Sequence, residues 1–524
     1  MPSSEPLTNV DAAWLGMEDP TNLMMVSGIL TFDGPINFER LRAVLERRLL
    51  PISRFRQRVM QPKLPFTTPY WEYDPTFNLD NHLHRVALPA PGDKKALQEM
   101  VSDLMSTPLD FSKPLWHFHV IENYEGGGVL MGRLHHCIAD GIALIQVLLS
   151  LTDFSAEAPL PPPPEEDDQD GQGGGMIQAL IQQAASAVKT ARKVSGKVVS
   201  EGLEAIINPA HALELALSGT DHAVAAGRLV LRTSDPQTIF KGPLGVRKRA
   251  AWSRPLPLKD IKAIKNVTGG TVNDVLVSAM TGALRQYLVA KGQDVEDLNF
   301  RAAVPVNIRK PEEMTQLGNK FGIVFLSLPV GIADPLDRLA EVRKRMLALK
   351  NSPEAIAAFG ILGAIGMNPK AIQEQIVNMF GAKTTCVMTN VPGPQFPLYL
   401  AGSRIKDFMF WVPQSGRVGL GISIMSYDQQ VFLGVATDAG LIPDPDEIIN
   451  YFYDEFDALM ALVKTAQAVE QAEAGKKTQP LEAEEPAANA ETAVTCQATT
   501  KSGKPCKLKP TAGSQYCHVH QNKA

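Results

Sequence analysis

Two long blocks of the chain carry hydrophobic patterns that predict a mixture of helices and strands. Short or alternating apolar runs predict strands, and apolar residues recurring every three or four positions predict helices. In the first block we predict strands at residues 26–32, 54–59, 81–86, 117–122 and 128–134, and helices at 12–17, 37–50, 94–105 and 142–151. In the second block we predict helices at residues 260–267, 271–288, 334–349 and 447–463, and strands at 301–307, 321–328, 384–390, 419–427 and 431–437. Strands and helices do not alternate strictly in either block, which favours an α+β fold over a doubly wound sheet.

The remaining stretches have compositions that predict linkers and connectors. Residues 156–175 hold a proline run, then acids, then glycines, and this composition cannot bury a core, so we predict a disordered linker. Residues 176–246 are predicted to be a helical connector whose first part is basic and amphipathic, which suits either an anionic membrane surface or packing on the protein itself. Residues 470–495 are predicted to be a second flexible linker. The predicted folded parts are therefore residues 1–155, 247–469 and 496–520.

Length and composition are those of a globular protein with more than one domain. The chain has 524 residues, of which 44% are hydrophobic and 20% charged. Outside the acidic linker, 51 basic residues face 50 acidic ones, so the charge gives no indication of a nucleic-acid partner. Residues 1–5 lack the features of a signal peptide, and the longest uncharged apolar run, 355–367, is shorter than the roughly 20 residues that span a bilayer. We expect a cytoplasmic protein, with peripheral contact to the inner membrane face or to lipid droplets left open.

The residues with the clearest chemical potential follow the predicted strand 128–134. His135 and His136 stand at its end, and Asp140 and Gly141 stand at the start of the predicted helix 142–151. An imidazole at such an edge is a natural general base near neutral pH, and Asp140 is close enough in sequence to turn towards it. The alternative is a strand-to-turn junction whose histidines only satisfy buried backbone groups. In this strand–turn–helix context the spacing HHxxxDG favours the chemical interpretation.

Several motifs together resemble those of the bacterial wax ester synthase/diacylglycerol acyltransferase family. The HHxxxDG segment alone also resembles other acyltransferases of the chloramphenicol acetyltransferase type. The accompanying motifs are Pro114-Leu115-Trp116, Asn273-Asp274, Pro305-Val306-Asn307-Ile308-Arg309, Leu317-Gly318-Asn319 and Thr389-Asn390-Val391-Pro392-Gly393-Pro394. The resemblance covers about residues 5–468, with two departures: Phe111 stands where the family usually has arginine, and the Pro/acid/Gly insertion is long.

This resemblance implies a fold, a reaction and partners. The fold would be two chloramphenicol-acetyltransferase-like domains with the active site in a tunnel between them. The reaction would be acyl transfer from acyl-CoA to diacylglycerol or a long-chain alcohol, with acyl-CoA as a substrate and no cofactor for catalysis. Rival interpretations are another HHxxxDG enzyme of condensation or polyketide-ester type, and a non-enzymatic lipid-surface binding protein.

The resemblance and the local sequence together suggest roles for individual residues. We expect His136 to be the general base and Asn273 to donate to the developing oxyanion, although a plain N-cap is the alternative for Asn273. We expect His135 and Asp140 to support the histidine turn, with Arg309 as an ion-pair partner of Asp140. Further support is expected from Gly141, which would permit the turn, and from Asp274, Pro114 and Trp116. Either a rigid turn or a wall of the CoA channel is expected at Asn390, Pro392 and Gly393, and either a core helix or a tunnel wall is expected at 355–367.

The last part of the chain predicts a separate metal-binding module. Cys496, Cys506, Cys517 and His520 offer three thiols and an imidazole, which suits a closed tetrahedral Zn²⁺ site, and His518 could replace His520. Such a small module cannot fold on hydrophobic burial alone, so metal would supply the folding energy. Its lysines make it locally basic, which suits a nucleic-acid or acidic-protein contact. The alternative is a tail without metal.

Overall fold

The computed structural model describes residues 4–62, 67–160, 219–310, 313, 317–350, 352–478 and 494–521. The chain divides into two compact units, residues Met1–Ala466 and Gln467–Ala524. Most of the predicted linker 156–175 and the basic first part of the predicted connector lie outside the described residues. Mixed helices and sheets confirm the predicted α+β class.

The first sheet has six strands and is built from both halves of the chain. Its strands, in spatial order, are β13 (Tyr399–Leu400), β14 (Ser403–Trp411), β2 (Met25–Phe32), β7 (Gly127–His135), β6 (Trp116–Tyr124) and β5 (Leu83–Ala87). All neighbours are antiparallel except β5 and β6. The hydrophobic pattern did not reveal β14, which pairs with β2 so that Phe408 lies opposite Leu30. The second half of the chain therefore completes the sheet that carries the histidine motif.

The second sheet is mixed and comes from the second half of the chain. Its path is β11 (Phe321–Leu328), β10 (Phe300–Asn307), β12 (Cys386–Pro392), β15 (Leu420–Tyr427), β16 (Gln430–Asp438) and β8 (Lys248–Trp252), and β9 (Leu256–Pro257) pairs with β16. Strand β12 is parallel to both neighbours, and the other pairs are antiparallel. A small third sheet contains β1 (Glu5–Pro6), β4 (Tyr70–Tyr73) and β3 (Gln57–Met60).

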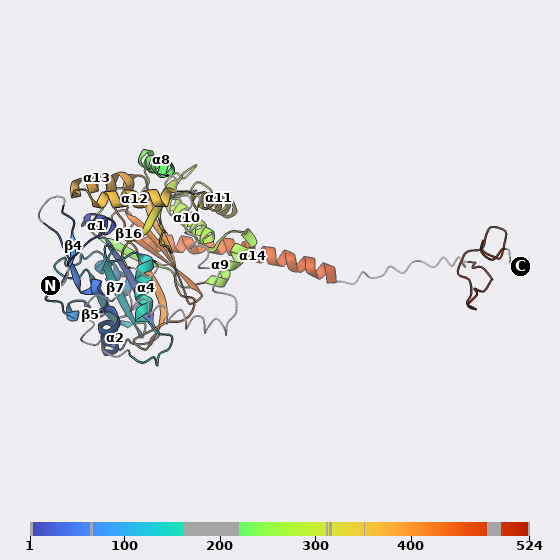
Figure 1. Ribbon diagram of the computed structural model, residues 1–524, viewed down its shortest axis with the longest axis horizontal. Coiled ribbons are helices and arrows are strands. Elements are labelled where there is room, and N and C mark those ends of the chain that lie inside the picture. The colour runs from blue at the N-terminus through green and yellow to red at the C-terminus, as the bar shows by residue number, and fades with distance from the viewer. Residues whose placement is uncertain are drawn as a thin grey trace. The chain divides into compact units, whose positions relative to one another are not determined.

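Helices cover the sheets (Figure 1). The helices are α1 (Asn9–Gly16), α2 (Phe38–Val44), α3 (Lys94–Met105), α4 (Gly141–Leu151), α8 (Gly219–Leu231), α9 (Leu258–Thr268), α10 (Val272–Ala290), α11 (Pro335–Lys350), α12 (Glu354–Gly366), α13 (Lys370–Ala382) and α14 (Pro445–Thr478). Helix α12 packs against α1, α8, α13 and β11, so it joins the two halves of the first unit. None of the helices within the described ranges is long and apolar enough to cross a membrane.

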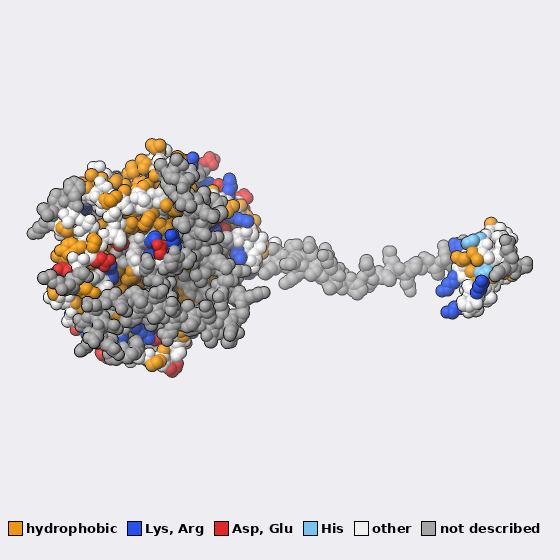
Figure 2. All heavy atoms as spheres, in the orientation of Figure 1, with side chains coloured by type: hydrophobic (Ala, Val, Ile, Leu, Met, Phe, Trp, Pro, Cys, Tyr) orange, Lys and Arg blue, Asp and Glu red, His pale blue; other side chains and the backbone are white. Residues whose placement is uncertain are grey.

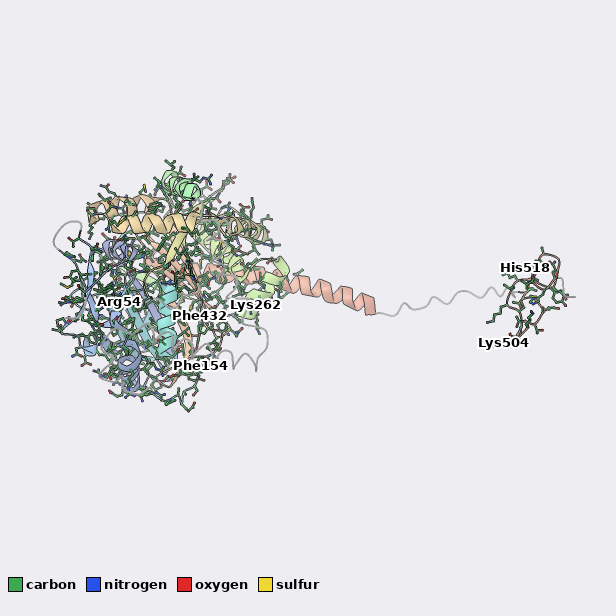
Figure 3. The ribbon with its side chains drawn as sticks, viewed as in Figure 1. Arg54, Phe154, Lys262, Phe432, Lys504 and His518 are labelled. Atoms are coloured by element: carbon green, nitrogen blue, oxygen red, sulfur yellow. The ribbon has the colours of Figure 1, made fainter. Side chains whose placement is uncertain are left out.

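Each large sheet has its own hydrophobic core. The first core joins α1, α3 and α4 to the first sheet, and the second joins α9, α10 and α14 to the second sheet. Phe432 of β16, which is buried, belongs to the first core although its strand belongs to the second sheet (Figure 3). The two sheets therefore share packing, because side chains of β16 reach the core of the first sheet.

Several predicted boundaries were wrong for local reasons. Helix α1 begins before the predicted helix 12–17, at Asn9, because Thr8 caps it: the Thr8 side chain accepts from the backbone N–H of Asp11. The predicted helix 37–50 ends in a π-helical turn over Leu45–Leu49, and the start of the predicted strand 54–59 is a 3₁₀ turn over Ser53–Arg56. Helix α14 runs to Thr478, into the predicted second linker, because Ala, Glu, Gln and Lys are good helix formers.

Candidate active site

A cavity of about 560 Å³ lies within the first unit, and residues from both halves of the chain line it. Most of the residues that line it are apolar, and a smaller number are polar. Polar side chains that line it include His136 and Asp140 of the histidine motif, Asn273, Arg309 and Asn390. Cavities of this kind, apolar with a small number of convergent polar groups, are typical of sites for small molecules. The structure thus has a cavity at this place, and the predicted tunnel between two domains stays a prediction.

His136 is fixed by its backbone and by aromatic neighbours. Its N–H donates to the carbonyl of Met24 (2.7 Å), and its carbonyl accepts from Nδ2 of Asn319 (2.7 Å). Its ring stacks on Trp14, with centroids 4.1 Å apart and planes 20° apart, and lies 5.7 Å from the ring of Phe321. The side chain lines the cavity although the residue is only 6% exposed. The imidazole is therefore held in one position at the cavity wall.

Burial lowers the pKa of His136 to about 4, and the nearby Asp140 carboxylate offsets only part of this effect. The imidazole is therefore neutral at neutral pH, which is the form that can accept a proton. Because the neutral form persists until the pH falls to about 4, kcat/KM is expected to fall near pH 4 and not near the ordinary histidine pKa of about 6.5.

Removal of the Trp14 indole tests the cause of this low pKa. Replacement of Trp14 by alanine is expected to let water reach His136 and to move the acid limb of kcat/KM from about pH 4 towards about pH 6.5. Replacement by phenylalanine keeps an aromatic face and is expected to leave the limb low. The measurement is the pH profile of kcat/KM for the three proteins. Superimposable profiles for the wild type and the alanine variant would contradict this assignment.

Asp140 holds the turn through bonds that do not involve His136. Its Oδ1 accepts from the N–H of Ala143 (3.0 Å) and so caps α4. Its Oδ2 accepts from Nη1 of Arg309, within a buried ion pair, and from the N–H of Lys320 (2.9 Å). Both carboxylate oxygens are engaged in this way, so the predicted Arg309 partner is in place and Asp140 does not turn towards the base.

His135 faces away from the cavity and lies against the Pro114-Leu115-Trp116 segment. Its N–H donates to the carbonyl of Leu115 (2.9 Å), and its Nδ1 accepts from the N–H of Cys137 (3.1 Å). Trp116 is fully buried, and its Nε1 donates to the carbonyl of Phe55 (2.9 Å). This segment therefore braces the strand end on which His136 is mounted.

Asn273 and Asn390 both line the cavity and form a hydrogen-bonded pair. Nδ2 of Asn390 donates to Oδ1 of Asn273 (2.9 Å), which leaves Nδ2 of Asn273 without a partner among the described residues. Asn273 is not the N-cap of α10. Thr271 caps this helix and forms a capping box with Asp274. The alternative interpretation of Asn273 as a plain cap is therefore wrong.

Other predicted residues take different positions. Gly141 lines the cavity at the first residue of α4, and a Cβ there would meet only Val391, at 3.7 Å. The turn does not require glycine, since Gly141 has no left-handed φ. Pro392 lines the cavity, whereas Gly393 packs on β15 and donates to the carbonyl of Ser426 (2.8 Å).

The apolar run 355–367 forms most of α12, which is part of the core, as one of the two predictions has it, and which also lines the cavity. Leu362 and Ile365 are buried and contribute to the first core, and both also line the cavity. Ala355 and Ile361 line the cavity as well. The helix is therefore part of the core and part of the apolar wall.

Comparison with known proteins identifies the family. A family model described as the wax ester synthase/diacylglycerol acyltransferase catalytic domain matches residues 7–276, and one described as the WS/DGAT C-terminal domain matches residues 317–460. The chain belongs to the wax ester synthase/diacylglycerol acyltransferase (WS/DGAT) family. It is an acyltransferase, as the histidine motif predicted.

Relatives and solved structures agree with this assignment. A Mycobacterium tuberculosis H37Rv protein named probable diacyglycerol O-acyltransferase tgs1 is 28% identical over 474 residues, covering 87% of this chain and 96% of the relative. A solved wax ester synthase/diacylglycerol acyltransferase from Marinobacter aquaeolei VT8 has a TM-score of 0.63 at 22% identity, covering 88% of this chain and 100% of that one. The first condensation domain of the calcium-dependent antibiotic synthetase has a TM-score of 0.54 at 15% identity, covering 88% and 96%. These two likenesses confirm the chloramphenicol-acetyltransferase-like fold.

Two residues of this WS/DGAT chain that contact His136, Trp14 and Asn319, had no role predicted from the sequence. Trp14 was assigned only to the predicted helix 12–17. Asn319 was quoted within a family motif without a role, yet its Nδ2 donates both to His136 and to Asp11 (2.7 Å each). Both residues are far in sequence from the HHxxxDG motif, so no local pattern reveals these contacts.

A second group of histidines in the WS/DGAT unit has a packing role. His117 and His119 lie on β6, and the ring centroid of each is 5.1 Å from that of His84. Burial, with Arg133 nearby, lowers the pKa of His117 to about 3 and that of His119 to about 4. Among the described residues, the group with metal-binding geometry is instead the Cys/His group of the second unit.

The second unit brings the four predicted metal ligands together. One ligand atom from each of Cys496, Cys506, Cys517 and His520 lies within 4.8 Å of all the others. Nδ1 of His520 lies 3.3 Å from Sγ of Cys517 and 3.7 Å from Sγ of Cys496. His520 takes the fourth position, and His518 is exposed.

Proposed function

We propose that this protein transfers a fatty acyl group from acyl-CoA to the hydroxyl of diacylglycerol or of a long-chain alcohol, giving triacylglycerol or a wax ester. The observation that carries this proposal is the neutral imidazole of His136 on the wall of a mostly apolar cavity. An apolar cavity suits acyl chains, and a neutral imidazole suits proton removal from an alcohol. The family and its named relatives support the same reaction.

The proposed reaction is direct transfer. His136 accepts the hydroxyl proton while the alcohol oxygen attacks the thioester carbonyl and forms the new C–O bond. The tetrahedral intermediate then collapses, the C–S bond breaks, and the imidazolium returns the proton to the CoA thiolate. The products are an ester and free CoA, and the imidazole is again neutral. No cofactor takes part, and Cys137 is not needed as a nucleophile, because burial raises the pKa of its thiol well above the ordinary value.

Asn273 supplies the proposed oxyanion donor. Its Oδ1 is occupied by Asn390, so its Nδ2 is the group turned to a substrate. It also lies in the first turn of α10, where the helix dipole favours a developing negative charge. Asn390 would act by orienting Asn273, and Pro392 would contact the substrate from the same wall.

An acceptor assay tests the reaction. Purified protein with palmitoyl-CoA is expected to release CoA and to form triacylglycerol with dioleoylglycerol and a wax ester with hexadecanol, with a His136→Gln preparation as background. The proposal would be contradicted if no CoA were released with dioleoylglycerol and none with hexadecanol. That outcome would favour a condensation-type or polyketide-ester transferase, whose fold is shared, or a non-enzymatic lipid-binding protein. Because the acceptors are lipids, we place the reaction at a cytoplasmic lipid surface, such as the inner membrane face or a lipid droplet.

We also propose that the second unit binds a structural Zn²⁺ ion through its three thiolates and His520. The support is the ligand set, since three sulfurs and one imidazole nitrogen form a typical closed zinc site. The unit has little else to stabilise it, because its buried core consists of the three cysteines with Ala498 and Tyr516 packed against them.

Metal analysis tests the zinc site. The full-length protein is expected to carry one zinc ion, and the Cys506→Ser and Cys517→Ser variants are expected to lose it, because a closed site needs all four ligands. Cys386→Ala, which removes a buried cysteine of the first unit, should retain the metal. Equal zinc in all four proteins would contradict the site.

A further inference from the structure

Residues 496–520 of the second unit carry exposed positive charge, and no acid lies among them. Residues 492–524 contain no Asp or Glu, and Lys501, Lys504, Lys507 and Lys509 are all exposed. With Zn²⁺ bound, the three thiolates leave a charge of one negative at the metal, so the four lysines make residues 496–520 clearly cationic. Figure 2 shows lysine side chains and no acidic ones on the visible face of this unit, and Figure 3 labels Lys504 on it.

Backbone hydrogen bonds arrange these lysines along a hairpin. Cys496 donates to the carbonyl of Leu508 (3.0 Å), Cys506 to that of Ala498 (2.9 Å), and Thr500 to that of Lys504 (2.8 Å). This register places Lys501 and Lys504 at the turn. The returning arm carries Lys507 and Lys509 on either side of Leu508. The cations are therefore spread along one short element, and two of them flank Leu508 in sequence.

The same unit exposes apolar side chains that its own folding does not use. Leu508 is 46% exposed and Val519 is 58% exposed, and neither belongs to the buried group of three cysteines. Apolar side chains beside lysines are typical of segments that lie in a lipid–water interface, where the cations meet anionic headgroups and the apolar groups enter the acyl boundary.

Nucleic acid fits these residues less well. Residues 494–521 contain no arginine, tryptophan or phenylalanine. Bidentate base contacts depend mainly on arginine, and stacking on bases depends on exposed aromatic rings. Lysine ammonium groups are point charges that suit a diffuse anionic surface. A lipid surface also uses Leu508 and Val519, whereas phosphate contacts would leave them in water.

We propose that the zinc-loaded second unit docks on anionic lipid surfaces through these four lysines, Leu508 and Val519. The benefit of docking rests on the proposed function, because docking would keep the acyltransferase unit at the lipid phase that contains its acceptor. Because both units belong to one chain, docking of the second unit would raise the effective concentration of lipid acceptor for the first.

Vesicle binding by the zinc-loaded full chain tests this proposal. Wild-type protein is expected to bind phosphatidylcholine vesicles that contain phosphatidylserine at least about tenfold more tightly than vesicles without it, and high salt should weaken this binding. The quadruple variant Lys501→Gln/Lys504→Gln/Lys507→Gln/Lys509→Gln is expected to lose this preference. Leu508→Ser should weaken binding several-fold while the salt dependence remains. Zinc content of each variant reports whether the unit still folds.

A matched variant controls for general charge. Lys259→Gln/Lys262→Gln/Lys265→Gln/Lys344→Gln removes four lysines from the first unit and is expected to leave vesicle binding unchanged. The proposal would be overturned if the quadruple lysine variant of the tail, loaded with zinc, bound these vesicles as tightly as the wild type does. It would also be overturned if the tail bound duplex DNA more tightly than it binds phosphatidylserine vesicles. Binding is measured without turnover, and acyl transfer with detergent-dispersed substrates should survive in the tail variant, so failure of docking and failure of the reaction are distinguishable.

Discussion

Replacement of His136 by glutamine is expected to lower kcat by roughly 10²–10⁴-fold, the usual contribution of a general base. Glutamine can occupy part of the space against Trp14, but it cannot accept the hydroxyl proton at neutral pH. The loss should fall on kcat more than on KM, because the apolar walls that hold the acyl chain are unchanged. The measurement is steady-state CoA release with palmitoyl-CoA and a saturating acceptor.

A histidine variant outside the cavity controls for nonspecific effects. His518→Gln, in the second unit, removes an exposed imidazole and is expected to leave kcat unchanged with detergent-dispersed substrates. If His136→Gln retained kcat within a few-fold of the wild type, another group would have to accept the proton, and direct transfer through His136 would be wrong.

Replacement of Arg309 by methionine is expected to lower the free energy of unfolding of the first unit by about 3–5 kcal/mol. The side chains of Arg309 and Asp140 are only 2% and 5% exposed, so loss of the cation leaves a buried carboxylate that keeps only its backbone donors. Arg309 also donates to the carbonyl of Gly318 (2.6 Å), and this bond would be lost as well. Urea unfolding followed by tryptophan fluorescence measures the effect, since all five tryptophans lie in the first unit.

Two further variants separate charge burial from simple loss of contacts. Asp140→Asn combined with Arg309→Met removes both charges while asparagine can still cap α4, so it should recover part of the lost stability. Arg404→Gln, which breaks an exposed ion pair with Asp428, is expected to leave the urea midpoint unchanged. An Arg309→Met midpoint equal to that of the wild type would contradict the structural importance of the pair.

Local sequence determined the elements that carry the site. The run ending at His135 forms β7, and the apolar run after Gly141 forms α4, because alternation and helical spacing act within one element. Helix α3 has the predicted bounds, since Asp93 caps it and Leu97 and Val101 form its buried face. The Cys/His spacing of the tail also predicted the cluster that the structure contains.

Only the tertiary structure decided which distant residues meet at His136. Strand β14 lies more than 350 residues after β2 yet pairs with it, and no period within β14 encodes that partner. The Asn273–Asn390 pair and the Asn319 bridge to His136 likewise join residues that are 117 and 183 positions apart. Such contacts follow from the packing of whole elements and from burial, which is also the cause of the low pKa of His136. Local patterns therefore predict the chemical groups and the elements that carry them, whereas their partners and their environment follow from the packing of distant elements.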